Sequence, residues 1–302
     1  MDQYCPALGS LTYSTTSQPG TLLFGAPAIN IAGLHTLNIV AGDNFSIQHL
    51  IPLLKAHCDA LVNMDFRGMI NQQSTMTQSL PEQGVVVKQL SHLSFYPDEA
   101  NDGNALVQWI LKHMPNARKV QVTNCNIDDK DMYEAMKHAK NLKSLSFTLP
   151  SPSFIYLLEY HGTLGQQSSL NSVSIDINFS GEHSALAFKA VAHLSNLRTL
   201  YLQLYGAALG EEFVALIENM ARGCPFLEEL VMESPVEFPP AIMVKFPLYP
   251  NLQELTLVSP NVWDEWLLQL LKCPSLSALF IDRENMQDHV AAKLGDLVFF
   301  IG

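Results

Sequence analysis

The chain has 302 residues, of which 48% are apolar and only 15% are charged, against about 25% charged residues in an average protein. This composition excludes a disordered chain, which would be polar and highly charged. The formal net charge of −12 disfavours nucleic acid and anionic membranes as partners, because both are bound mainly through Lys and Arg. No apolar run approaches the ~20 residues that cross a bilayer, and residues 1–14 lack a secretory signal. We expect a folded protein of the cytoplasm or nucleus.

An apolar triad at offsets 0, +3 and +5 recurs along almost the whole chain, as in NLQELTL at 251–257 and NLRTLYL at 196–202. Eleven triads have a mean spacing of 26.8 residues. They begin at Leu8, Leu34, Leu61, Leu90, Ala117, Leu142, Leu170, Leu197, Leu227, Leu252 and Leu276. Within each triad the apolar residues at +3 and +5 alternate with polar ones, which is typical of a short strand with one buried face.

Between the triads the apolar spacing becomes helical. Three such segments place four apolar or aromatic residues at i, i+3, i+4 and i+7. In chain order they are Met132, Ala135, Met136 and Ala139; Phe213, Leu216, Ile217 and Met220; and Trp263, Trp266, Leu267 and Leu270. One strand and one helix cannot bury their apolar faces alone, but stacked copies share a core. The sequence therefore predicts an α/β solenoid over residues 1–302, with a parallel strand row on one side and helices on the other.

Three segments interrupt the helical pattern, and the triad phase continues through all of them. Residues 14–30 are rich in Ser, Thr, Gly and Pro and are expected to form a loop. Residues 71–84 are expected to form an exposed insertion. Residues 234–250 contain five prolines and allow at most a short helical turn.

The chain resembles leucine-rich repeat proteins over about residues 4–284. Several triads are preceded by Cys, often followed by Pro, as at Cys5, Cys58, Cys224 and Cys273. This phrase resembles the cysteine-containing repeats of F-box/leucine-rich-repeat proteins. The resemblance implies a single curved leucine-rich-repeat domain of about eleven repeats, which recruits a substrate on its concave strand side for a ubiquitin ligase. In that family an F-box ties the solenoid to a Skp adaptor and a cullin.

The sequence departs from this family in two ways. The Cys or Asn that usually stands at +8 is found only at Cys125 and Asn178, whereas Pro150, Pro235 and Pro260 fill that position elsewhere. No F-box is visible. The chain opens inside a repeat and ends in an apolar tail where a polar cap is expected, so we expect a part of a longer protein, with any F-box and its Skp adaptor contact encoded upstream.

The residue types that carry chemistry do not form a catalytic pattern, and we expect neither an enzyme nor a cofactor or metal site. The five cysteines are at least 49 residues apart, which excludes a C-x-x-C zinc motif; we expect buried, reduced thiols. Among the ten histidines, four are expected at helix C-termini, where a cation suits the helix dipole. They are His57, His113, His138 and His193.

The predicted binding face consists of the residues at +2, +4 and +6, which point away from the helices. The candidates in the first half are Arg67, His92, Tyr96 and Lys119, and those in the second half are Asp176, Tyr201, Glu229, Glu233, Glu254, Phe280 and Asp282. The five acids favour a protein partner with a basic segment. The aromatic residues are the expected anchors.

The leading hypothesis is a non-enzymatic interaction module, the substrate-recognition part of an F-box/leucine-rich-repeat subunit. The alternative is a free-standing leucine-rich-repeat scaffold or regulator with no ubiquitin role. A third hypothesis, a GTPase-activating protein, would need a positioned arginine, and Arg67 is the only arginine on the predicted face.

Overall fold

The computed structural model describes residues 9–14, 33–41, 50–68, 86–97, 104–123, 128–148, 151–178, 183–206, 209–260, 264–281 and 288–300. The chain forms two compact units, Met1–Thr148 and Leu149–Gly302. The expected loop at 14–30 and the expected insertion at 71–84 lie almost wholly outside the described residues.

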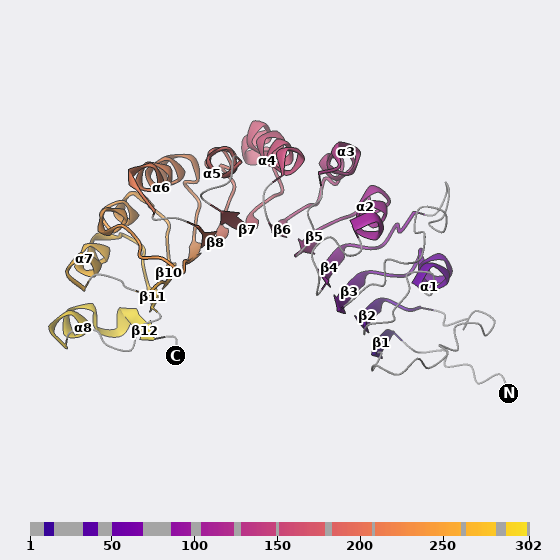
Figure 1. Cartoon of the computed structure of the whole chain (residues 1–302), viewed down its shortest axis with the longest axis horizontal. Coiled ribbons are helices and arrows are strands. Elements are labelled where there is room, and N and C mark those ends of the chain that lie inside the picture. The colour runs from indigo at the N-terminus through magenta and orange to yellow at the C-terminus, as the bar shows by residue number, and fades with distance from the viewer. Residues whose placement is uncertain are drawn as a thin grey trace. The chain divides into compact units, whose positions relative to one another are not determined.

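The first unit contains six parallel strands that pair in chain order (Figure 1). Its elements are β1 (Ser10–Ser14), β2 (Thr36–Ala41), α1 (Leu50–His57), β3 (Asn63–Gly68), β4 (His92–Pro97), α2 (Asn104–Lys112), β5 (Lys119–Val122), α3 (Lys130–Lys137) and β6 (Ser144–Thr148). The helices cover one face of these strands and leave the other face open.

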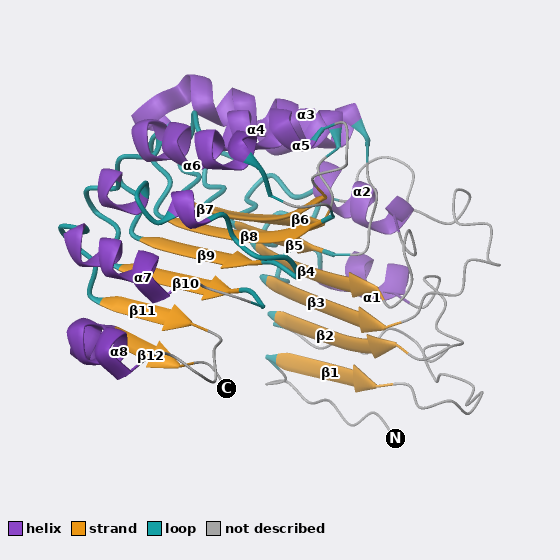
Figure 2. Cartoon of the chain, turned by 60° about the vertical axis from the view of Figure 1, so that its left-hand side comes forward, coloured by secondary structure: helices purple, strands orange, loops and turns teal. Residues whose placement is uncertain are grey.

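The second unit repeats this arrangement with strands β7 to β12 (Figure 2). Its helices and strands are α4 (Pro152–Leu164), β7 (Ser172–Asn178), α5 (Ser184–Val191), β8 (Thr199–Tyr205), α6 (Glu211–Gly223), β9 (Glu229–Glu233), β10 (Glu254–Val258), α7 (Asp264–Leu267), β11 (Ala278–Ile281), α8 (Asp288–Leu294) and β12 (Val298–Phe300). Short 3₁₀ helices are η4 (Gly165–Gln167), η5 (Pro240–Ile242), η6 (Phe246–Leu248), η7 (Leu268–Lys272) and η8 (Gly295–Leu297).

The predicted triads form the core. Every triad residue from Leu34 to Leu257 is at most 3% exposed, and each strand alternates buried and more accessible positions. The α/β solenoid of leucine-rich-repeat type is therefore confirmed in each unit. Residues 234–250 form η5 and η6, in agreement with the expectation of short helical turns.

One expectation about the second unit is wrong. Trp266 was expected on the buried helix face, but its side chain is 38% exposed, because the short helix α7 gives way to η7 after Leu267 and the helical spacing is not maintained. Beyond the predicted triads, β12 adds a further strand that pairs in parallel with β11, with Val298 opposite Leu279.

An asparagine ladder links successive repeats. In three repeats the link is made by the Asn that stands just before the first triad residue. Its side-chain N–H donates to the backbone carbonyl of the residue that lies two positions before the preceding triad. Asn116 Nδ2 lies 2.7 Å from Lys88 O, Asn196 Nδ2 lies 2.7 Å from Ser168 O, and Asn251 Nδ2 lies 2.8 Å from Pro225 O. Ser275 makes the equivalent bond to Pro250 O. The Asn of NLRTLYL and NLQELTL is the sequence signal for these bonds.

The prediction of buried thiols is confirmed at two of the three described cysteines. Cys224 and Cys273 are buried and free, and burial raises the pKa of each thiol to about 12. Cys58 is free but only partly buried. Cys5 and Cys125 lie outside the described residues. High thiol pKa values disfavour nucleophilic chemistry at the two buried positions.

The histidines predicted at helix ends lie there. His57 is the last residue of α1 and His138 is the C-cap of α3. His113 follows α2, and its Nδ1 donates a hydrogen bond to Trp109 O at 2.6 Å, which satisfies a carbonyl of the last turn. His193 lies just after Ala192, the C-cap of α5.

Candidate functional site

The open strand face is the side of each strand row that the helices do not cover. The strand register aligns the predicted +2, +4 and +6 residues of neighbouring repeats. In the first unit Asp65, Ser94 and Gln121 follow one another across β3, β4 and β5. In the second unit Asp176, Gln203 and Glu233 form such a row across β7, β8 and β9. Adjacent strands are about 4.8 Å apart, so side chains in one row are close enough to contact a single ligand together.

Arg67 is engaged within the first unit. Its Nε lies 3.1 Å and its Nη2 lies 3.2 Å from the two carboxylate oxygens of Asp65, and its guanidinium lies 5.3 Å from the ring centre of Tyr96 on the next strand. Bidentate pairing with Asp65 and the cation–π contact with Tyr96 hold the guanidinium over the strand face. Nothing here resembles an arginine extended toward a nucleotide, so the structure does not favour the GTPase-activating hypothesis.

His92 and Lys119 are neighbours on β4 and β5. The His92 ring is hydrogen-bonded to Ser91 Oγ at 2.8 Å. Burial and the nearby cations Lys119 and Arg118 lower the pKa of His92, so the imidazole is neutral at pH 7. Of this pair, only Lys119 presents a charge on the open face.

The second unit carries a group of acids that we call the acidic strand face: Asp176, Glu229, Glu233 and Glu254. Glu229 and Glu254 are directly opposite each other on β9 and β10. Like charges at directly opposed positions repel each other, and Thr199 Oγ1, 3.3 Å from Glu229 Oε2, is a neutral partner only.

Asp176 and Glu233 are the second pair of this face, separated by Gln203. Burial and, secondarily, the charge of Glu233 raise the pKa of Asp176 to about 6. The Tyr201 hydroxyl donates a hydrogen bond to Glu233, and burial together with this bond and charge raises the pKa of Tyr201. Burial and the charges of Asp176 and Glu233 also raise the pKa of Tyr205. Two carboxylates and two phenol rings therefore form one cluster.

Tyr205 was missed because only offsets up to +6 were considered. Strand β8 continues to Tyr205, and the alternation Tyr201, Gln203, Tyr205 is the sequence signal that reveals it. Its side chain is 40% exposed, which leaves its ring accessible to a partner.

Among the residues that the structure describes, the acidic strand face has no compensating cation. Within the described ranges, none of its four carboxylates is in an ion pair with Lys, Arg or His; the ion pairs of the second unit join Arg198 to Glu228 and Glu218 to Arg222 and Lys245. Uncompensated like charges that raise a carboxyl pKa are more frequent at functional sites than elsewhere.

Two predicted site residues contribute differently. Phe280 is half-buried, with Thr256 opposite it on β10 and Phe299 on β12. Asp282 lies outside the described residues. In the part of the chain that is described, no group of three or more His, Cys, Asp and Glu side chains is arranged to hold a metal ion. Nor does that part contain a helix that is both long and apolar enough for a membrane span.

Comparisons with known proteins give no family assignment. No family model matches the chain, and no curated protein matches it. One similar solved structure is a TLR13–ssRNA13 complex, with 12% sequence identity and a TM-score of 0.30 over 88% of this chain and 52% of that chain. The chain thus spans about half the length of that structure, and the fold assignment rests on the strand and helix arrangement of each unit.

Proposed function

We propose that residues 1–302 act as one leucine-rich-repeat domain, a non-enzymatic interaction module whose acidic strand face binds a basic segment of a protein partner. The observation that carries this proposal is the absence of a cationic partner for Asp176, Glu229, Glu233 and Glu254 among the described residues. A Lys or Arg side chain placed there relieves the repulsion among the four acids. Electrostatic complementarity of this kind gives register and fast association.

The tyrosines strengthen this proposal. Tyr201 and Tyr205 border the carboxylates of Asp176 and Glu233, and the face of a phenol ring attracts a Lys or Arg cation. Tyr residues contribute strongly to interface affinity because they bury a large area at little conformational cost.

The test is a paired charge reversal. We expect Glu229→Lys together with Glu233→Lys to weaken binding of a fluorescent Lys- and Arg-rich peptide by about tenfold or more, since close charge pairs couple by ~1.5 kcal/mol or more. The matched control is Glu211→Lys with Glu212→Lys, the same change of charge at the exposed first turn of α6. Unchanged affinity in the first variant, in fluorescence anisotropy at low salt, contradicts the proposal.

A ubiquitin-ligase role is a more specific proposal. Its support is the Cys that precedes several triads, as at Cys224 and Cys273. We propose that the full-length gene product joins a Skp adaptor through an F-box and presents the bound partner for ubiquitin transfer. Affinity purification of that product should recover a Skp adaptor. If none is recovered, the chain is a scaffold or regulator without a ligase, and the binding role of the acidic strand face is unaffected.

A further inference from the structure

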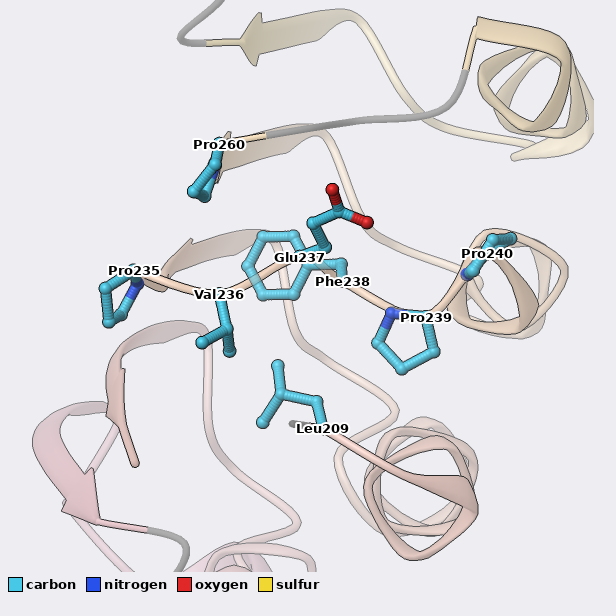
Figure 3. Close-up of a pocket in the computed structure, with 8 residues that line it drawn as sticks. All are labelled: Leu209, Pro235, Val236, Glu237, Phe238, Pro239, Pro240 and Pro260. Atoms are coloured by element: carbon cyan, nitrogen blue, oxygen red, sulfur yellow. The ribbon is translucent and has the colours of Figure 1, made fainter. Parts of the chain in front are cut away.

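An apolar hollow lies at the carboxyl ends of β8, β9 and β10 (Figure 3). It has a volume of about 570 Å³, within the range of sites that bury a small ligand or a large side chain. Leu209 and Phe238 are buried beneath it, only 7% and 1% exposed. Pro235 and Pro260 are exposed at its border. The walls are therefore mostly apolar, with the Glu237 carboxylate among them.

The hollow is preformed by hydrogen bonds of the serines that precede the two +8 prolines, Pro235 and Pro260. Ser234 and Ser259 precede the two prolines at equivalent repeat positions and are both buried. Ser234 Oγ accepts a hydrogen bond from Val236 N at 3.1 Å, and Ser259 Oγ donates to Val236 O at 3.2 Å. Ser234 N donates to Val258 O at 2.8 Å. A loop fixed in this way loses little entropy when a ligand enters.

Its floor is continuous with the core. The Phe238 ring stacks on Phe213 of α6, with ring centres 6.4 Å apart and an interplanar angle of 18°. Phe213 in turn meets Phe188 of α5 edge-on at 6.0 Å. The hollow therefore rests on packed aromatic rings rather than on movable surface side chains.

The hollow adjoins the acidic strand face. Strand β9 ends at Glu233, and Ser234 alone separates it from Pro235, so the two Cα atoms are no more than about 7 Å apart. Glu237, which also lines the hollow, adds a carboxylate (Figure 3). A basic side chain that reaches Glu233 brings the next residues of its own segment over the hollow.

We propose that the hollow receives an aliphatic or aromatic side chain of the same basic segment that the acidic strand face binds, one to three residues from its Lys or Arg. This inference rests on the proposed function and names the partner more narrowly: a basic segment that carries one apolar anchor. The carboxylates select the charge, and the hollow supplies the apolar contact.

A library of random twelve-residue peptides displayed on phage, selected on the full chain, tests this inference. We expect enrichment of Lys and Arg with Leu, Ile, Met or Phe within three residues. A labelled peptide from that selection should bind about tenfold more tightly than its copy with Gly at the apolar position, because burial of one such side chain contributes this much.

Variants separate the two sites. Val236→Asp should abolish the advantage of the apolar residue, and Val236→Ala should reduce it; circular dichroism reports whether each variant is folded. The matched control is Val244→Asp, since Val244 is 40% exposed and does not line the hollow. Enrichment of Lys and Arg without an apolar residue, or equal affinity of the Gly peptide, would overturn the binding role of the hollow. The binding role of the acidic strand face would be unaffected. A selection without Lys and Arg overturns the proposed function and this inference together.

Discussion

The imidazole of His161 is buried on α4 with one of its two nitrogens bonded. Its Nδ1 lies 2.9 Å from Ser168 Oγ, and its Nε2 is buried with no hydrogen-bond partner. The same Ser168 Oγ accepts a bond from Leu170 N at 3.2 Å, at the start of a triad. Burial lowers the pKa of His161 from 6.5 to about 4. At pH 7 the buried imidazole is therefore neutral.

The His161 environment predicts a loss of stability in acid. Because the folded pKa is lower than the unfolded one, the unfolded chain binds more protons between about pH 6.5 and pH 4, and stability falls as the pH is lowered through that window. The loss is on the order of 3 kcal/mol at its limit. Thermal unfolding at several pH values measures it.

The matched variants for this prediction are His161→Leu and His138→Leu. The first should flatten the dependence of stability on pH between 6.5 and 4, and the second, at an exposed helix cap, should leave it unchanged. Identical pH profiles in both variants would show that His161 is not the group responsible.

At the scale of the elements, neighbouring helices of the second unit approach so closely that one glycine is required between them. A Cβ atom at Gly223, the last residue of α6, would lie 1.6 Å from the carbonyl oxygen of Ala192, the C-cap of α5. The obstacle is backbone, which cannot rotate away. The close contact brings Cys224 Sγ within 3.3 Å of Val191 O.

Gly223→Ala should therefore destabilise the chain by about 3 kcal/mol or more, as overpacking against backbone does. Gly210→Ala is the matched control, because a Cβ atom at this N-cap of α6 would meet nothing within 4 Å; its cost should stay below about 1 kcal/mol. Chemical denaturation of the two variants decides between tight and loose packing of α6 on α5. Equal losses of stability in the two variants would contradict a close contact between Gly223 and the carbonyl of Ala192.

The asparagine ladder gives a second prediction at this scale. Asn196→Ala removes the bond to Ser168 O and leaves a part-buried carbonyl without its partner, which should cost about 1 kcal/mol or more. Asn219→Ala, on the exposed side of α6, should cost nothing because Ala favours helices. A comparable loss in both variants, measured by denaturant unfolding, would speak against the ladder.

At the scale of the whole molecule, the net charge of −12 is concentrated in part on a surface that folding itself does not neutralise. Burial and Glu233 raise the pKa of Asp176 to about 6, above its unfolded value. The carboxylate of Asp176 is thus disfavoured by the fold, and stability is lost as the pH rises from about 4 through 6. The carboxylate of Asp176, which we propose as part of a binding surface, is therefore kept at the expense of stability.

We therefore expect Asp176→Asn to stabilise the free chain by about 1 kcal/mol at about pH 7.5, after allowance for its partial exposure, with no gain near pH 4. Added salt, which screens repulsion between accessible charges, should raise the melting temperature of the unmodified chain more than that of the variant. Asp131→Asn, exposed on α3, serves as the control. If the melting temperature of Asp176→Asn is at or below that of the unmodified chain, the Asp176 carboxylate is not destabilised by burial and by the charge of Glu233.

Much of the fold could be predicted from the sequence because burial follows strict periods. The offsets within each triad fit a strand with one buried face, and the spacing from Phe213 to Met220 fits a helix with one buried face. A solenoid of alternating strands and helices buries both. Trp266 was misplaced because periodicity does not show where a helix tightens into a 3₁₀ turn. Strand β12 was missed because its three residues have no triad.

The candidate site was predictable in part. Glu229 and Glu254 could be placed side by side because their offset within the repeat is the same. The hydrogen bond from Tyr201 to Glu233 runs diagonally between β8 and β9, because Tyr201 lies opposite Val231. It depends on the twist of the sheet and the length of the two side chains, which the position within the repeat does not show. The hollow depends on Ser234 and Ser259, whose hydroxyls fold the loops back, and no spacing rule shows this.

The asparagine ladder also determines where the chain accepts changes in length. The distance from the side-chain amide to the carbonyl it binds is 2.7 to 2.8 Å in all three repeats that have this bond, whereas the repeats themselves vary from 24 to 30 residues. The extra residues must therefore enter after a strand and before the next helix ends, since a residue added between the asparagine and its leucine would shift the strand register by one. Epitope tags and fluorescent labels inserted after a strand keep the strand row intact, and a single residue inserted before a triad disrupts it.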